Sequence, residues 1–250
     1  MQGNNASAAR RRQLVKALTT AGLLARYGTA GGLMGFMQRV LANGNNPVPP
    51  GLHKLTGTVR VNGAPARAGQ LIKPGDTVVT DPDSEAIYVI GQDAFMQRGG
   101  STVGFGKSSA DFMRVVTGRI LSVFGKGERQ VKFSTAVIGI RGTACYIEEK
   151  VGVTAGNPLL GTRGTADDKA PTYFCLCYGT AQITPTAAPD QQETIQTTHH
   201  DHPLYISDDM QMPSTMVSAE VINHTDAELI LLENLVGRRP PFYGKADSHY

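Results

Sequence analysis

Short segments that alternate apolar and polar residues recur through the middle of the chain, with glycine, proline and asparagine turns between them. Residues 58–61 end at Asn62-Gly63, a dipeptide typical of tight hairpins, and residues 74–76 form a second turn signal. The segments follow one another at intervals of about 8–15 residues, as strands do in sandwiches and rolls. Further segments of this kind are 77–80, 85–90, 101–105, 114–117, 119–124, 130–133, 143–148, 173–184 and 194–198. The pattern predicts a mainly β fold built of short antiparallel strands.

The N-terminal part of the chain has a different character, basic and only weakly apolar. Arg11 and Arg12 open an Arg-Arg-x-Leu-Val-Lys pattern, which is typical of a bacterial twin-arginine export signal. The stretch that follows is interrupted by charged residues and has no apolar run of the roughly 18 residues that a membrane span needs. We expect an export signal or anchor helix at 1–42, a linker at 43–51 and a periplasmic location. Association with the inner membrane through residues 10–42 is the anchored alternative.

Charge is divided unevenly along the chain. Of the 24 lysines and arginines, six lie in residues 1–42 together with no acidic residue, which leaves 18 basic against 21 acidic residues in the remainder. The body that follows the export segment is therefore nearly neutral. It gives no electrostatic reason to expect a nucleic-acid partner.

One helix is signalled near the C-terminus. Thr225 and Glu228 have the spacing of a capping box, in which each side chain bonds the backbone amide of the other residue. Apolar residues then recur at helical spacing until Gly237. The sequence therefore predicts a β domain over 52–198 and a C-terminal extension over 199–250, with a helix at 226–236.

Several segments of the β domain resemble a FecR domain. They are Gly-Thr-Val-Arg-Val-Asn-Gly at 57–63, the stretches 72–80, 86–91 and 116–125, and a Gly-Ile-Arg-Gly-Thr signature within 135–143. The resemblance implies a FecR-like β roll or sandwich. The iron-dicitrate regulator that gives the domain its name has a periplasmic part that receives a signal from an outer-membrane transporter. It also has an anti-sigma segment, of which we find no counterpart in this sequence. Such a likeness implies binding or scaffolding with a protein partner in the periplasm or inner membrane, rather than catalysis.

The signature also suggests structural residues. Gly139 and Gly142 flank strands where a tight turn, a bulge or a close backbone approach is expected. Arg141 lies between them, and its planar guanidinium is suited to clamp a carboxylate. We expect Gly139, Arg141 and Gly142 to be structural.

Cysteine and histidine residues form the most specific chemical pattern. Cys175 and Cys177 are two apart in an expected strand, so their side chains share one face. Cys145 lies on the preceding strand, where antiparallel pairing could bring it opposite either of them. His200 and His202 likewise share a face if their segment is extended. These five residues are the predicted ligands of a metal ion, with zinc, copper or iron as candidates.

Two other interpretations of the cysteines stay open. In an oxidising compartment Cys145 could form a disulfide with Cys175 or Cys177, whereas a bridge between the latter two would be strained. The thiols could also be inert core residues. We find no Gly-x-Ser-x-Gly, His-Glu-x-x-His or phosphate-loop motif, so no enzymatic activity is expected.

Together these observations predict a periplasmic, FecR-like binding or scaffold protein that holds a metal ion through its cysteines and histidines. One alternative is an accessory subunit of an inner-membrane complex, held there by a retained N-terminal helix. Another is a redox protein that exchanges thiols among Cys145, Cys175 and Cys177.

Overall fold

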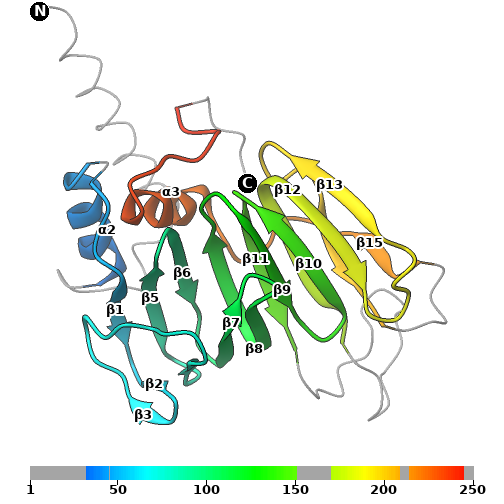
Figure 1. Ribbon diagram of the computed structural model, residues 1–250. Helices are drawn as coiled ribbons and strands as arrows, with labels where there is room; N and C mark the ends of the chain where they lie inside the picture. The colour runs from blue at the N-terminus through cyan, green and yellow to red at the C-terminus, as the bar shows by residue number, and fades with distance from the viewer. Residues whose placement is uncertain (1–31, 45, 151–169, 209–213, 245–250) are drawn as a thin grey trace, which may run out of the picture.

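The computed structural model describes residues 32–44, 46–150, 170–208 and 214–244 (Figure 1). Fifteen strands and two helices make up this part of the chain. In chain order they are α2 (Leu33–Ala42), β1 (Gly51–Thr56), β2 (Val59–Val61), β3 (Ala64–Pro65), β4 (Thr77–Thr80), β5 (Glu85–Ile90), β6 (Asp93–Gln97), β7 (Ser101–Ser108), β8 (Asp111–Val123), β9 (Glu128–Lys132), β10 (Ala136–Arg141), β11 (Ala144–Glu149), β12 (Thr172–Pro185), β13 (Glu193–Thr197), β14 (Pro203–Ile206), β15 (Met216–Ser218) and α3 (Asp226–Leu235). The prediction of a mainly β fold with a C-terminal helix is confirmed.

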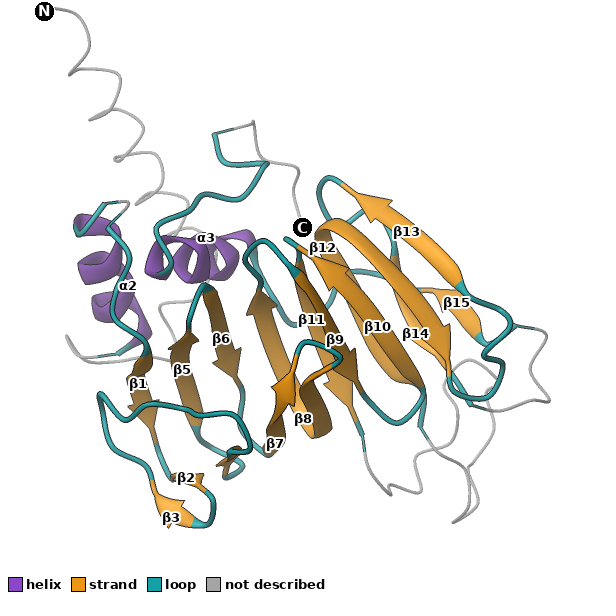
Figure 2. Cartoon of the chain, in the orientation of Figure 1, coloured by secondary structure: helices purple, strands orange, loops and turns teal. Residues whose placement is uncertain are grey.

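The strands form two hydrogen-bonded sheets that share their longest members. Sheet A has the order β1-β5-β6-β8-β11-β12-β14-β15. Sheet B has the order β3-β2-β4-β7-β8-β9-β10-β12-β13. The pairings between described strands are antiparallel except that of β8 with β9. Since β8 and β12 pass from one sheet into the other, they join the two sheets into one body (Figure 2).

Glycines mark the two points where the shared strands change sheet. Gly118 in β8 has a φ of +91°, and Gly179 in β12 has a φ of +98°, a region that residues with a Cβ rarely adopt. A Cβ at Gly179 would lie 2.6 Å from the Thr143 side chain, and one at Gly118 would meet Ser101. The sequence pattern predicts two strands, 114–117 and 119–124, on either side of Gly118, whereas the structure shows one strand that bends there.

The largest apolar cluster fills the space between the sheets. The face of sheet A that points into this space, called here the inner face, contributes Phe95, Phe174 and Leu176. Sheet B contributes Val103 and Ile138, among others. This packing follows from the period-two alternation of each strand.

The opposite side of sheet A, called here the outer face, is covered by the helices. Ile87, Leu121 and Tyr146 of the sheet cluster with buried leucines of α3 and with apolar side chains of α2. Figures 1 and 2 show both helices on the same side of the strands. Because both faces of sheet A are covered, residues of both faces are buried in its central strands, as in β5, where five of six residues are buried.

Helix α3 begins with the predicted capping box. The amide of Glu228 donates to the Thr225 hydroxyl at 3.3 Å, and the amide of Thr225 donates to the Glu228 carboxylate at 3.1 Å. The same carboxylate accepts a hydrogen bond from Arg98 at 2.7 Å. Arg98 also bonds Glu85 at 2.9 Å, so a buried charge network ties the start of α3 to sheet A.

Helix α2 lies within the stretch expected to be an export or anchor segment. Its residues Leu33, Phe36, Met37 and Val40 are buried against the outer-face cluster, so this part of the chain is packed as part of the folded body. Arg11 and Arg12 lie outside the described residues. No helix in the described ranges is long and apolar enough to cross a membrane.

Of the three residues of the Gly-Ile-Arg-Gly-Thr signature that were expected to be structural, only Gly142 has the expected role in the structure. Gly142 has a φ of +60° after β10, which fits the expected turn. Gly139 lies in β10 without a positive φ, and a Cβ there would make ordinary contact with Gln182 at 3.7 Å. Arg141 is exposed at the end of β10, and no salt bridge to it occurs within the described residues. The carboxylate clamp expected of Arg141 is therefore absent from this part of the structure.

Candidate metal centre

Cys175 and Cys177 lie side by side on the outer face of sheet A. Both belong to β12, and their side chains are fully buried. Leu176 between them points into the inner core. The strand geometry expected from sequence thus places the two thiols on one face.

His200 reaches the thiols from the segment that follows β13. Its amide donates to the carbonyl of Cys177 at 2.9 Å, and its φ of +54° is left-handed. The Asp201 carboxylate accepts bonds from the amides of Thr198 and His199, so the segment turns instead of running extended. The expected alternation of faces therefore fails here. His200 is buried, whereas His202 is exposed and outside the cluster.

His224 completes the group from the segment just before α3. Its ring stacks on Tyr146 with 4.6 Å between the centroids, and its Nδ1 lies 2.7 Å from the carbonyl oxygen of Ile222. Asn223 beside it has a φ of +58° and donates to the buried Glu148 at 2.6 Å. His224 is not among the ligands predicted from the sequence, because its approach to the thiols depends on the packing of its segment against Tyr146.

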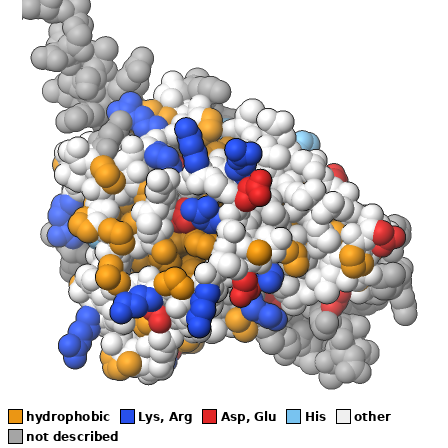
Figure 3. Space-filling model, in the orientation of Figure 1, with side chains coloured by type: hydrophobic (Ala, Val, Ile, Leu, Met, Phe, Trp, Pro, Cys, Tyr) orange, Lys and Arg blue, Asp and Glu red, His pale blue; other side chains and the backbone are white. Residues whose placement is uncertain are grey.

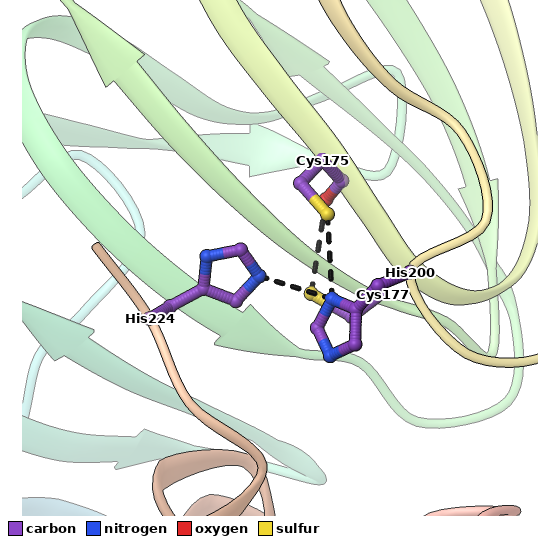
Figure 4. Close-up of side chains that lie close together, drawn as sticks. All are labelled: Cys175, Cys177, His200 and His224. Atoms are coloured by element: carbon purple, nitrogen blue, oxygen red, sulfur yellow. Dashed lines mark hydrogen bonds between the residues drawn. The ribbon is translucent and has the colours of Figure 1, made fainter. Parts of the chain in front are cut away.

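The four side chains converge on one point, as Figure 4 shows. Their ligand atoms all lie within 4.8 Å of one another. The Nε2 of His224 is 3.1 Å from the Nδ1 of His200, and the Sγ of Cys175 is 3.4 Å from that same Nδ1. In a tetrahedral zinc site the corresponding edges are about 3.3 Å between nitrogens and about 3.6 Å between nitrogen and sulfur. These two distances match the edges of a tetrahedral Cys₂His₂ site, and all four ligand atoms are close enough together to be candidates for binding one ion.

Hydrogen bonds on the far side of each imidazole fix its tautomer. The Nε2 of His200 lies 3.2 Å from Asp226 Oδ1, an acceptor, so this nitrogen carries a proton. The carbonyl of Ile222 likewise requires a proton on the Nδ1 of His224. The lone pairs of the other two nitrogens then face each other, which is unfavourable unless a proton or a cation lies between them. Such outer partners are typical of metal-binding histidines.

The pKa values of the thiols are shifted in opposite directions. A hydrogen bond from Cys177, assisted by His200 and His224 against the effect of burial, lowers the pKa of Cys175 to about 3. Burial and the neighbouring Cys175 raise the pKa of Cys177. Burial lowers the pKa of His200, but Asp226 and Cys175 outweigh it and raise this pKa to about 9. The arrangement thus favours a thiolate beside an imidazolium, and a bound cation would take the place of the proton.

Thiol chemistry is a second use that the contacts permit. Cys175, His200 and Asp226 form a relay in which a base touches the thiol and a carboxylate orients the base. A nucleophile must reach its substrate, however, and the side chains of Cys175 and Cys177 are wholly buried. Surface cavities at residues 64–70 and beside α2 are not lined by the thiols. The geometry therefore favours a metal ligand over a nucleophile.

Cys145 is separated from the cluster by the sheet itself. A bulge between Ala144 and Cys145 shifts the register, so Cys145 pairs with Leu176. Its side chain is buried on the inner face, where burial raises its pKa. Since its Cβ points away from Cys175 and Cys177, a disulfide with either would need the backbone to move. All three cysteines are free thiols.

Comparisons with known proteins leave the family open. No protein-family model matches the chain, and no curated protein matches it. Two crystal structures of a "putative anti-sigma factor" from Parabacteroides distasonis, at 1.65 Å and 2.50 Å resolution, resemble it with a TM-score of 0.42 and 5% identity. Each alignment covers 57% of this chain and 58% of the other. The resemblance to FecR domains accordingly stands on the sequence motifs.

Proposed function

We propose that the protein is an exported binding or scaffold protein whose β body is stapled by a Cys₂His₂ metal centre. Cys175, Cys177, His200 and His224 are the ligands. The single observation that carries this proposal is the convergence of these four side chains, whose ligand atoms all lie within 4.8 Å of one another in a buried site. Cys145 and His202, which the sequence also suggested as ligands, have no part in it.

The donor set favours zinc over copper and iron. Two thiolates and two imidazoles in a tetrahedron are the usual ligands of structural zinc. Protein side chains would fill all four coordination positions of the ion. Structural zinc sites have this arrangement, whereas catalytic sites leave one coordination position open for water or substrate. We therefore assign the centre to stability rather than to catalysis.

The metal would join parts of the chain that are far apart in sequence. Cys175 and Cys177 come from β12, His200 from the turn after β13, and His224 from the start of the C-terminal helix. A single ion would fasten α3, which covers much of the outer face, to the central strand of the fold. Such binding stabilises the folded chain by mass action.

Export and a protein partner are the remaining parts of the proposal. The twin-arginine pattern at Arg11 and Arg12 supports passage to the periplasm in the folded state, so a metal could be loaded before transport. On the face drawn in Figure 3, Lys and Arg side chains lie scattered among apolar and acidic ones rather than in one basic patch. The nearly neutral charge of the chain after residue 42, with 18 basic against 21 acidic residues, supports a protein partner over nucleic acid.

The direct test is metal analysis of protein purified without chelators, combined with titration of the reduced, metal-free protein with Co²⁺. We expect tightly bound metal together with the intense absorption of cobalt thiolate, and Cys177→Ser should lose the tightly bound ion and most of this absorption. Cys145→Ala is the matched control and should keep both. Protein that shows no thiolate absorption with Co²⁺ would rule out the centre.

A second candidate function has one observation in its favour. Because α2 is packed on the body, residues 33–42 are suited to stay with the protein, as an accessory subunit held at the inner membrane by its N-terminal segment would require. Cell fractionation distinguishes the two: this candidate predicts protein in the membrane fraction, and the first predicts release with the periplasm.

A further inference from the structure

A second group of metal-binding side chains lies directly beside the Cys₂His₂ centre. His199, His200 and Asp226 offer ligand atoms that all lie within 4.8 Å of one another. The geometry points to a second cation position at these three side chains, which would take a divalent transition-metal ion such as Zn²⁺. This inference rests on the proposed metal centre, because His200 belongs to both groups.

The carboxylate of Asp226 accepts hydrogen bonds from both imidazoles. The Nε2 of His199 lies 2.9 Å from each carboxylate oxygen, and the Nε2 of His200 lies 3.2 Å from Oδ1. These contacts are hydrogen bonds in the metal-free arrangement. A cation about 2.1 Å from each ligand needs edges of about 3.4 Å. The edges from the two imidazole nitrogens to Asp226 must therefore lengthen by only about 0.2–0.5 Å to admit it.

The two positions differ in their access to water. The side chain of His200 is 2% exposed, whereas those of His199 and Asp226 are 19% and 33% exposed. The second position thus has three protein ligands and a side open to solvent, while the first has four ligands and none. Three protein ligands with an open coordination position are the pattern of exchangeable and catalytic metal sites.

The shared imidazole would bridge the two ions. The Nδ1 of His200 faces the thiols and His224, and its Nε2 faces Asp226 and His199. When a cation binds on each nitrogen, the proton on Nε2 leaves to solvent and the ring becomes an imidazolate. No electron is transferred in this step. The negative charge of Asp226 favours the second cation beside a first centre whose two thiolates already balance its ion.

His199 provides a clean test of this position, since it is absent from the buried centre. The untagged, reduced protein is dialysed to equilibrium against excess Zn²⁺, and the bound metal is counted per chain. We expect two ions in the natural protein and one in His199→Ala. The control is His202→Ala, an exposed histidine in the same segment that belongs to neither group, which should keep two. One ion in the natural protein, or two in His199→Ala, would overturn the inference.

A Co²⁺ titration separates this inference from the proposed function. The buried centre gives thiolate absorption, whereas the second position has nitrogen and oxygen ligands only. If the inference holds, His199→Ala loses one cobalt ion while its thiolate absorption stays unchanged. Absence of the thiolate absorption from the natural protein would instead overturn the proposed function.

Discussion

Sheet A carries cysteines on both of its faces. Cys145 on the inner face belongs to the apolar cluster between the two sheets, whereas Cys175 and Cys177 on the outer face meet two histidines beneath the C-terminal segment. The inner face is covered by another sheet, which supplies alternating apolar side chains. The outer face is covered by helices and turns, whose polar termini and loops bring imidazoles and carboxylates into the interior. The same residue type is thus a packing group on one face and a candidate metal ligand on the other.

Substitution of one cysteine on each face of sheet A should give the largest difference in metal content and stability. Cys177→Ser should lose the ion of the buried centre and, with zinc at about 1,000 times the dissociation constant of that centre, about 4 kcal/mol of unfolding free energy. Cys145→Ala should keep the metal and lose about 1 kcal/mol through a small cavity. Urea unfolding with parallel metal analysis measures both. Equal losses of metal in the two variants would contradict the assignment of the faces.

Removal of α2 should weaken the outer face next most. A chain that begins at Asn43 lacks the buried side chains Leu33, Phe36, Met37 and Val40, each of which contributes about 1.5–3 kcal/mol by burial before the cost of ordering the helix. We expect a net loss of about 3 kcal/mol relative to a chain that begins at Gly32. Thermal unfolding of the two truncated chains gives the answer, and equal stability would show that α2 adds nothing to the body.

The bend that carries β12 between the two sheets is tested by a pair of glycines. Gly179→Ala places a Cβ against Thr143 at a φ of +98°, and it should cost about 2–3 kcal/mol. Gly139→Ala, where the Cβ has room at 3.7 Å, should be neutral or slightly stabilising. Denaturant midpoints compare the two. A neutral Gly179→Ala would mean that the bend does not need glycine.

The smallest expected effect is a pH-dependent change in stability caused by Glu149, a buried carboxyl group on the inner face. Glu149 is buried, and burial raises its pKa even though hydroxyl groups, such as that of Thr172, bond it. A raised carboxyl pKa in the fold means that ionisation opposes folding, so this cost is present at neutral pH and fades as the pH falls towards 4.5. Glu149→Gln should therefore gain under about 1 kcal/mol at pH 7 and nothing near pH 4.5. A gain that grows on acidification would contradict this cause.

Local patterns predicted some features of the site, and contacts distant in sequence decided the rest. The shared face of Cys175 and Cys177 follows from strand alternation, and the capping box of Thr225 and Glu228 follows from helix geometry; both depend on a few adjacent residues. The place of Cys145 depended on a bulge, which no spacing rule reveals.

The histidines show the same limit. His200 and His202 were assigned to one face of an extended segment, but the Asp201 turn rotates His200 inward and leaves His202 exposed. His224 approaches the thiols only because its segment docks on Tyr146 of the neighbouring strand. Tertiary packing of this kind has no signature in the adjacent sequence.

X-ray absorption spectroscopy at the zinc edge tests the central claim most directly. It should be applied to His199→Ala loaded with one Zn²⁺ ion per chain, so that the buried centre alone is measured. The account predicts two sulfur ligands at about 2.3 Å and two imidazole nitrogens at about 2.0–2.1 Å. A first shell of nitrogen and oxygen without sulfur would contradict it, and would leave Cys175 and Cys177 as packing residues like Cys145.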